Sequence, residues 1–512
     1  MCIIGCSLVV SVSSRNNVRV EMHSSVETRA NMFRQRYLQI QQRLLRSGKF
    51  VLRGMSSSAK PGLQNVAKAD RKIEISSIES LLGSTSSTNR LLLAYITQPE
   101  EEGQWYLEDL STSIIKVDLS RLFNDSGTGN SGGTGCGNIN KLFMEGNIVL
   151  VEGSVVRSRR VFEAQSLCYP AAEERSTTMR ALGQNGMYSL WCGADQAVNS
   201  GMNRPQYWEE MEGLELRDEG QMIVSLADIE LDKPHVTEKL QQLFATFESS
   251  FEDSASSDGV RDLNQAPVFI LVGPFIVQTD ILSYQGRELA LRCWDEFARL
   301  LINCCPVLLA VAKFVFVPSS KDVYCTGGNS AAMPHFPISD LFTDSFRRQL
   351  AVHITHTREM LGLDPAPDAE NIVFTSNPSR VHYYSQELVI FQEDFLRRMQ
   401  KHAHFFPPAA GAAAPGDQDL DASMNMSVDD PDAGDGGDSR LAGSARLILQ
   451  CILDQGHLSP LSLTHNLSPL IWSLDHAMSL SPLPHLVSSL CMLRIHDLCS
   501  HFFLLLPLFF FS

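Results

Sequence analysis

The chain has 512 residues, of which 44% are hydrophobic, so it is long enough to form two or three domains with cores of their own. Its formal net charge of −16 argues against a protein whose main role is to bind the phosphate backbone of duplex nucleic acid, because such binding needs clustered Lys and Arg. The 12 cysteines include no Cys-x-x-Cys pair. This cysteine usage suits a reducing compartment and argues against zinc ribbons and a disulfide framework.

Both ends of the chain are apolar, but neither is predicted to be a membrane anchor. Residues 1–10 lack the basic n-region and the cleavage site of a secretory signal. Residues 501–511 are too few to cross a bilayer as a helix. We therefore expect no membrane partner.

The first periodic segment is residues 34–46, whose apolar side chains recur at helical spacing: Tyr37, Ile40, Leu44 and Leu45. This pattern predicts a short, basic, amphipathic helix that packs on the body of the protein. We place it in an N-terminal helical segment at residues 32–74, after a divergent N-terminus at residues 1–31.

Five short runs with alternating apolar residues follow: LLLAYITQ, QWYLED, SIIKVDLS, NIVLVEGSVV and RVFEAQSLCY. Charged or glycine-containing turns separate them, which is typical of a small closed barrel. We predict an OB-fold at residues 75–172. Between the third and fourth runs, Gly127, Gly129 and Gly132 match G-x-G-x-x-G, but no helix can start in the glycine-rich stretch after them. We interpret that stretch as a flexible loop.

From residue 220 the apolar runs are longer and do not alternate: MIVSLADI, APVFILVGPFIV, AKFVFVPS, NIVFTSNPS and QELVIFQED. Helical stretches lie among them, which indicates an α/β sandwich whose strands are buried on both faces. We place this domain at residues 220–405. Polar residues with a function should lie where such strands end, at Asp228, Pro274, Ser319 to Asp322, and Asn377.

An acidic segment rich in Gly, Ala and Pro then interrupts the domain. Residues 406–445 contain too few bulky side chains to bury a core, so we predict a disordered loop there. The interrupted domain is expected to continue at residues 446–486. Residues 487–512 form an atypical apolar tail.

The first two strand ends of the second domain lie where a metallophosphoesterase would have Asp-x-His and Gly-Asp. Such an enzyme holds two cations about 3.5 to 4 Å apart through a shared carboxylate, and a metal-bound water is its nucleophile. Here the chain has Asp228-Ile229-Glu230 and Gly273-Pro274, and Pro274 offers no ligand oxygen. His457, in QGHLSPL, resembles a further phosphoesterase ligand, but it would serve only half a site. A structural histidine that closes a turn is the favoured interpretation of this residue.

We therefore interpret Asp228, Glu230, Pro274 and His457 as degenerate former metal positions and assign no catalytic residue and no cofactor. A cation held by Asp228, Glu230 and Asp232 is the weaker alternative, because the sequence supplies no further ligands for it. Two histidine pairs have zinc-compatible spacing but no completing ligand nearby, and are interpreted as surface or packing residues: His353 with His356, and His402 with His404.

On the predicted barrel, Trp105, Tyr106 and Phe162 are of the kind that stacks on bases in OB-folds. They are our candidates for contact with nucleic acid or with a partner protein. Because the chain is acidic, core packing or contact with a protein is the favoured interpretation.

Six segments resemble, in order and spacing, the B-subunit family of replicative DNA polymerases, and most closely its epsilon branch. They are MFRQRYLQIQQRLLR at Met32, ESLLGS at Glu79, YITQ with YLED, KFVFVPSSKD at Lys313, FTSNPSRVHYYSQELVIFQED at Phe374, and ILDQGHLSPL at Ile452. Together they span residues 32–486.

This resemblance implies an α+β multidomain protein, in which an OB-fold is joined to a calcineurin-like phosphoesterase domain that has lost catalysis. It implies a nuclear, non-catalytic scaffold that binds the cysteine-rich C-terminal domain of the catalytic subunit of DNA polymerase epsilon. The replicative helicase and its GINS assembly are the second implied partner, with DNA contacted mainly through the complex. Two alternatives stay open: an independent single-strand DNA-binding protein acting through the OB-fold, and a metallophosphoesterase with an atypical metal site.

Overall fold

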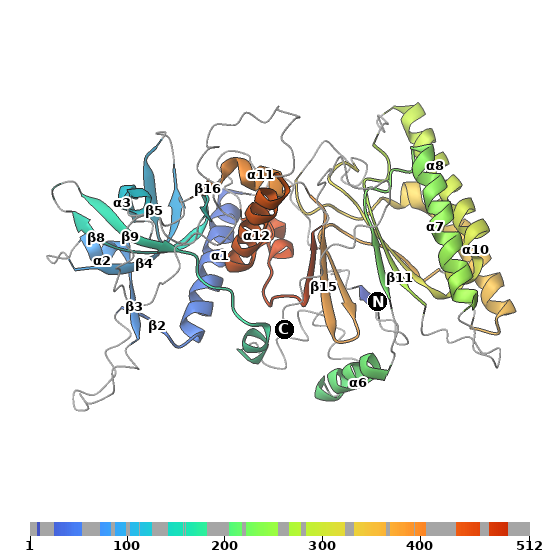
Figure 1. The fold of residues 1–512 in the computed structure, drawn as a ribbon, viewed down its shortest axis with the longest axis horizontal. Helices are drawn as coiled ribbons and strands as arrows, with labels where there is room; N and C mark the ends of the chain where they lie inside the picture. Colours follow the sequence, from blue (N-terminus) through green and yellow to red (C-terminus); the bar gives the residue numbers. More distant parts are fainter. Residues whose placement is uncertain are drawn as a thin grey trace.

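The computed structural model has an elongated arrangement, with a β-barrel at one end and long helices at the other (Figure 1). The residues that it describes are 8–10, 25–53, 72–82, 88–98, 103–111, 113–124, 142–156, 158, 160–181, 204–217, 222–253, 266–277, 283–322, 332–364, 369–393, 395–405, 437–460 and 470–489. The glycine motif at residues 127–132 and most of the predicted acidic loop lie outside these ranges.

The five alternating runs form five strands, which confirms the prediction of a barrel. They are β4 (Arg90–Thr97), β5 (Trp105–Glu108), β6 (Ile114–Asp118), β8 (Ile148–Val156) and β9 (Val161–Cys168). The order β4-β5-β6-β9-β8 closes because β4 also pairs with β8. Short elements extend this end: β2 (Phe50–Leu52), β3 (Ile73–Ser76), α2 (Ile78–Leu82), α3 (Ser120–Asn124) and β7 (Leu142–Phe143).

The N-terminal helix α1 (Val26–Arg46) begins at Val26 rather than at Arg34, where the predicted helix starts. Its first turn is capped by Ser25, whose side-chain oxygen accepts the Thr28 N–H at 3.3 Å. One face packs on the barrel, where the Tyr37 hydroxyl donates to the Leu93 carbonyl at 2.7 Å. The predicted packing of this helix on the body is confirmed.

Four of the longer apolar runs form a parallel sheet in sequence order: β10 (Ile223–Leu226), β11 (Val268–Val272), β12 (Lys313–Val317) and β13 (Ile372–Phe374). The helices between them are α7 (Pro234–Asp253), α8 (Tyr284–Cys304), α9 (Pro306–Val311) and α10 (Asp340–Met360). Their apolar faces cover one side of the sheet through an aromatic core that includes Trp294 and Phe316, both 0% exposed.

A second sheet packs on the other side and contains β1 (Leu8–Val10), β14 (Ser379–Tyr383), β15 (Gln386–Phe391) and β17 (Leu486–Ser489). Buried residues of both sheets, among them Val315 and Val381, form one cluster between them. The sequence pattern grouped β15 with the parallel strands, whereas the structure pairs it with β14 and β17. A pattern of buried positions shows that a strand is internal, but it does not show which strands pair with it.

The remaining elements are α6 (Arg204–Arg217), α11 (Phe395–His402), β16 (His404–Phe405), α12 (Gly437–Gln455) and the 3-10 helix η5 (Trp472–Met478). Helix α12 begins at Gly437, inside the segment predicted to be disordered. It lies between the barrel and the second sheet (Figure 1), and one continuous apolar cluster contains Phe143 of β7, Ile448 of α12 and Val389 of β15. We call this contact the seam: α1, the barrel and residues 169–181 against β14, β15, α12, residues 456–460 and residues 470–489.

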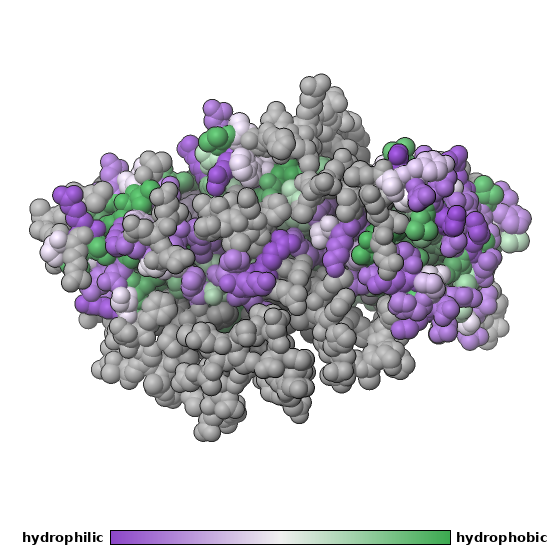
Figure 2. Space-filling model, turned by 90° about the horizontal axis from the view of Figure 1, so that it is seen from above, coloured by the Kyte–Doolittle hydropathy of each residue, from purple (hydrophilic) through white to green (hydrophobic). Residues whose placement is uncertain are grey.

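Hydrophilic residues cover much of the surface at the end formed by α7, α8 and α10 (Figure 2). None of the helices within the described ranges is both long enough and apolar enough to cross a membrane.

Candidate functional site

The carboxyl ends of β10 to β13 meet at one edge of the parallel sheet, which is where ligands bind in open α/β sheets. We call this the carboxyl edge: residues 227–233, 273–277, 318–322 and 375–378. Three of the predicted positions, Asp228, Glu230 and Pro274, lie here. The loops after β10 and β11 are joined directly, because the Leu231 N–H donates to the Phe275 carbonyl at 2.8 Å.

Asp322 is the acidic side chain most deeply placed at the carboxyl edge, with 2% of its surface exposed. One carboxylate oxygen accepts the Phe275 N–H at 2.7 Å, and the other accepts the Ser319 N–H at 2.8 Å. Gly273 leaves the room for this carboxylate, since a Cβ there would lie 2.1 Å from Asp322 Oδ2. Asp322 therefore ties the loop after β11 to the loop after β12.

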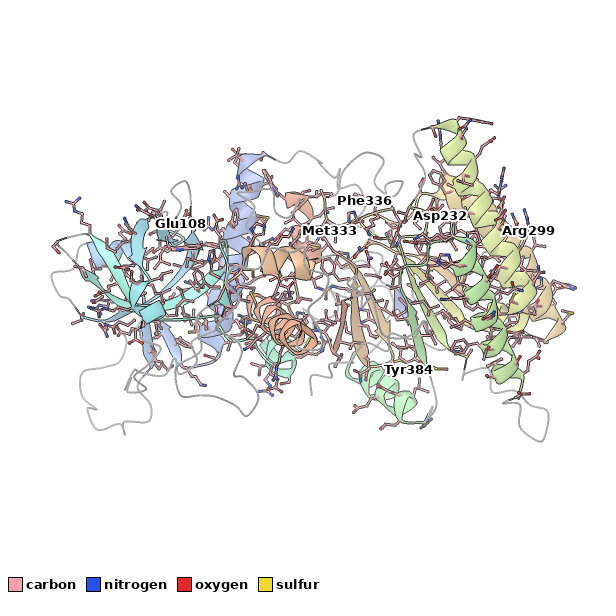
Figure 3. The ribbon with its side chains drawn as sticks, turned by 45° about the horizontal axis from the view of Figure 1, so that its top comes forward. Glu108, Asp232, Arg299, Met333, Phe336 and Tyr384 are labelled. Atoms are coloured by element: carbon pink, nitrogen blue, oxygen red, sulfur yellow. The ribbon has the colours of Figure 1, made fainter. Side chains whose placement is uncertain are left out.

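The other acids of the carboxyl edge are also engaged in local contacts. Glu230 pairs with Lys233 three residues later, and Asp232 accepts the Val277 N–H at 3.3 Å. Asp228 has a backbone φ of +55°, a conformation that Asp tolerates better than most residues, and its carbonyl accepts the Glu230 N–H at 3.0 Å. Asp232 lies beside the start of α7, far from the barrel residue Glu108 (Figure 3).

These contacts determine what the carboxyl edge can do chemically. A two-metal centre needs several carboxylate and imidazole ligands that converge on one point. Within the described ranges, no group of three or more His, Cys, Asp and Glu side chains is arranged to hold a metal ion. What the structure does record here is two carboxylates, those of Asp232 and Asp322, that accept backbone N–H groups and join the loops.

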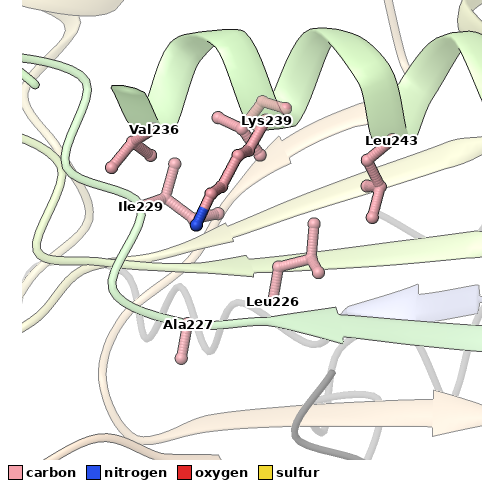
Figure 4. A pocket seen from close by; sticks show the side chains of 7 residues that line it. Leu226, Ala227, Ile229, Val236, Lys239 and Leu243 are labelled. Carbon is pink, nitrogen blue, oxygen red and sulfur yellow. The ribbon is translucent and has the colours of Figure 1, made fainter. Parts of the chain in front are cut away.

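A small depression lies next to the carboxyl edge, between the end of β10 and α7 (Figure 4). Its lining is apolar apart from one side chain, and consists of Leu226, Ala227, Ile229, Val236, Lys239, Leu240 and Leu243. Substrate pockets combine an apolar wall with several converging polar groups that fix orientation. This depression offers only the Lys239 amine, so it is not a candidate catalytic pocket.

The structure places His457 in the seam, not at the carboxyl edge. Its Nδ1 accepts the Ser459 N–H at 3.0 Å, and its Nε2 lies 3.1 Å from Asp475 Oδ1. Burial is the largest cause that lowers the pKa of His457, and the nearby Arg36 lowers it further. The ring is therefore neutral, with Nε2–H donating to Asp475. The bond from the Ser459 N–H closes a turn, as expected for a structural histidine, and the interpretation of His457 as a former metal position stays a prediction.

Asp475 joins His457 to the N-terminal helix. Arg36 of α1 donates to both carboxylate oxygens, from Nε at 3.2 Å and from a terminal nitrogen at 2.5 Å. Burial alone would raise the pKa of Asp475, but His457 and the Arg36 guanidinium outweigh burial and hold that pKa well below its usual range. The three side chains are 4 to 13% exposed, so water screens their charges only weakly.

A second charged group in the seam is centred on Glu387 of β15, whose side chain is 2% exposed. Arg175 and Arg380 each donate to one of its oxygens at 2.7 Å. Although burial works to raise the pKa of Glu387, the two guanidinium groups lower it overall. Arg175 also donates to the Leu483 carbonyl at 2.5 Å, so the group links residues 169–181 to the C-terminal segment.

Amide side chains complete the seam. Gln455, the last residue of α12, accepts the Ile148 N–H and donates to the Ile148 carbonyl, both at 2.9 Å, as a neighbouring strand would. Asn147 accepts the Tyr169 hydroxyl at 2.7 Å and donates to the Pro460 carbonyl at 2.8 Å. Sequence reasoning missed these roles, because Gln455 and Pro460 lie about 300 residues from their barrel partners.

The three barrel aromatics are not equivalent. Phe162 is 0% exposed and lies in the apolar cluster, and Trp105 is 9% exposed, with ring contacts to Phe143 at 5.1 Å and to His404 at 5.0 Å. Neither ring can stack on a base in this conformation, so they are core residues. Tyr106 is half-buried and is the one of the three that retains exposed surface.

The protein is thus a two-part assembly, in which a closed barrel is joined by a polar and apolar seam to a two-sheet body. At the carboxyl edge of that body, Asp232 and Asp322 are engaged in loop closure. Comparison with known families agrees with both parts. The profile of the B subunit of DNA polymerases alpha and epsilon matches residues 223–493, and that of the DNA polymerase epsilon subunit 2-like OB-fold domain matches residues 26–171. The chain belongs to the DNA polymerase alpha/epsilon B-subunit family.

Curated relatives give the same assignment along most of the chain. The DNA polymerase epsilon B-subunit of Arabidopsis thaliana is 25% identical over 469 residues, which cover 91% of this chain and 69% of the relative. DNA polymerase epsilon subunit 2 of Homo sapiens is 26% identical over 477 residues, covering 92% and 69%. The DNA polymerase epsilon B-subunit of Saccharomyces cerevisiae is 25% identical over 485 residues, covering 90% and 62%.

Proposed function

We propose that this chain is the non-catalytic accessory subunit of a nuclear DNA polymerase epsilon complex and acts in chromosomal DNA replication. The observation that carries the proposal is the family membership, together with the epsilon-type OB-fold domain at residues 26–171. Its role is positional: it binds the C-terminal domain of the catalytic subunit and links that subunit to the replisome through the replicative helicase and GINS.

We also propose that the two-sheet body is a phosphoesterase-like domain without catalysis, formed by residues 220–405 and 446–486. Two observations support this: Pro274 brings no ligand oxygen to the strand end, and both oxygens of Asp322 accept backbone N–H groups. Such a domain serves a replication complex through its surfaces. Large protein interfaces, rather than a pocket, are where we expect its partners to bind.

Co-expression tests the proposal directly. The chain would be produced together with the C-terminal domain of the polymerase epsilon catalytic subunit from the same organism, and the mass of the purified species would be measured. We expect a stable 1:1 complex that survives gel filtration. Two separately eluting proteins, each folded by circular dichroism, would contradict the proposed role.

A further inference from the structure

Helix α1 carries three regularly spaced arginines along one face. Arg29, Arg36 and Arg43 are spaced by seven residues, so they lie on one side of the helix. The adjoining face of the helix is fastened to the barrel by the Tyr37 hydroxyl and by the Tyr95 hydroxyl, which donates to the Phe33 carbonyl at 2.6 Å. The helix is therefore held between the barrel and the C-terminal segments.

Each of these arginines contacts a different part of the seam. The Arg29 guanidinium lies 5.4 Å from the centre of the Trp472 ring, and Arg43 donates to the Pro170 carbonyl at 2.7 Å and to the Asp454 carbonyl. Burial lowers the pKa of Arg43 to about 10, so it stays protonated at neutral pH. Of the three arginines, Arg36 is the one that forms a bidentate pair with a carboxylate, that of Asp475.

The apolar cluster and the charged pair contribute differently to the seam. Burial of apolar surface is non-directional, so Ile448 and Ile452 of α12 favour contact without selecting one alignment. A bidentate bond between a guanidinium and a carboxylate requires one alignment, because both N–H···O bonds depend on a shared plane. Buried ion pairs add little net stability compared with apolar packing, and fixing a register is their best-attested role.

We infer that the network of Arg36, Asp475 and His457 is a positioning device, which sets the angle at which the barrel and α1 lie against the two-sheet body. The inference rests on the proposed function in one respect: a partner that contacts both parts at once binds the aligned form. Arg36 is then a positioning residue that acts through alignment, without any need to touch the partner.

A matched pair of variants separates this role from a general effect on the helix. Arg36→Ala removes the bidentate contact, whereas Arg34→Ala makes the same change two residues away at an exposed position of α1. Asp475→Asn keeps the shape of the carboxylate and removes its charge, so it serves if Arg36→Ala does not fold. Arg36→Lys keeps the charge but cannot form the planar bidentate contact.

The readout is the distance distribution between the two parts in the free chain. Fluorophores attached through a non-natural amino acid at Ile114 of the barrel and Arg299 of α8 avoid the 12 cysteines, and Ile114 is 56% exposed. Single-molecule fluorescence resonance energy transfer between the two fluorophores should give one narrow distance population for the wild type and for Arg34→Ala. We expect a broadened or second population for Arg36→Ala and an intermediate result for Arg36→Lys. The inference would be overturned if Arg36→Ala and Asp475→Asn both gave the same distance distribution as the wild type.

Affinity for the C-terminal domain of the catalytic chain provides the functional readout. If only a tenth of the Arg36→Ala molecules are aligned, the apparent affinity falls about tenfold, because the dissociation constant scales inversely with the competent fraction. Unchanged affinity in a variant with a broadened distribution would overturn the claim that the partner needs the aligned form. If the wild type does not bind, the proposed function fails, while the distance distributions still decide whether Arg36 positions the barrel.

Discussion

Asp322, the most deeply buried acid of the carboxyl edge, and the two buried acids of the seam differ in what they bind. Asp322 accepts backbone N–H groups, whereas Asp475 and Glu387 accept N–H groups from arginine side chains, of which Arg36 and Arg175 come from distant parts of the chain. The contacts of Asp322 close loops within one sheet, while those of Asp475 and Glu387 join segments 439 and 212 residues apart. These charged interactions between residues far apart in the sequence therefore lie in the seam, where the barrel and α1 meet the two-sheet body.

If the two-sheet body is a non-catalytic phosphoesterase-like domain, as we propose, this contrast explains how its carboxyl edge persists without hydrolytic chemistry. Loop closure by a carboxylate requires only that its oxygens meet N–H donors, and Asp322 meets two of them. Metal catalysis would require the same oxygens to face a cation.

The largest expected effect is the loss of Glu387. Glu387→Ala leaves Arg175 and Arg380 without their shared carboxylate in a site where that side chain was 2% exposed. We expect a loss of about 3–5 kcal/mol in the free energy of unfolding, measured by urea denaturation. Glu230→Ala at the carboxyl edge is the matched control, and its partly exposed pair with Lys233 predicts a loss below about 1 kcal/mol. Equal losses in the two variants would remove the distinction between the regions.

The next effect tests whether Asp322 closes the carboxyl edge. Asp322→Ala leaves the N–H groups of Phe275 and Ser319 without this acceptor, at about 1–3 kcal/mol each. We expect a total loss of about 2–4 kcal/mol, and a smaller loss in Asp322→Asn, which retains one carbonyl oxygen. A fully stable Asp322→Ala protein would show that these loops close without the carboxylate.

The pH dependence of stability should come from buried neutral histidines. Burial lowers the pKa of His335 and of His382 to about 4, below the ordinary value of 6.5. Between pH 6.5 and 4 the unfolded chain binds protons that the folded chain does not, so stability is full above pH 6.5 and falls as pH decreases. Each histidine contributes a loss on the order of 3 kcal/mol.

His335→Phe tests this assignment, because it removes one titrating group from a position that is 2% exposed. We expect a shallower fall in the melting temperature between pH 6.5 and 4 than in the wild type. Asp454, whose pKa burial raises, works in the opposite direction and is unchanged in the variant. An unaltered pH profile would assign the acid sensitivity to other groups.

A smaller effect is expected from Gly273→Ala. The added Cβ would lie 2.1 Å from Asp322 Oδ2 and 3.1 Å from the Ser319 nitrogen, so the carboxylate must move. Overpacking of this kind costs about 1–3 kcal/mol. In the double variant Gly273→Ala/Asp322→Ala the two losses should not add, and strict additivity would show that the two positions are independent.

Much of the fold follows from local sequence patterns. The alternating runs predict the barrel strands, and the longer apolar runs predict β10 to β13, because side-chain burial is periodic within a strand. Pairing between distant segments leaves no such periodic signal. For that reason the pattern did not separate β15 from the parallel sheet, and it did not place β1 beside β14.

The candidate site, too, has features that are local in the sequence and features that depend on contacts between distant segments. Pro274 at the strand end could be recognised in the sequence, because the missing ligand oxygen is a property of the residue itself. The partners of His457 could not, since Asp475 and Arg36 are ordinary charged residues until the fold brings them together. Arginines at seven-residue spacing on α1 were the one available sign of the seam.

The most direct measurement is phosphodiesterase activity of the purified chain with added Mn²⁺, compared with Asp228→Asn, which keeps a side chain that tolerates the positive φ. If the carboxyl edge closes loops and performs no chemistry, both proteins should show the same background rate, with and without Mn²⁺. Hydrolysis that depends on Mn²⁺ in the wild type and disappears in Asp228→Asn would contradict that conclusion.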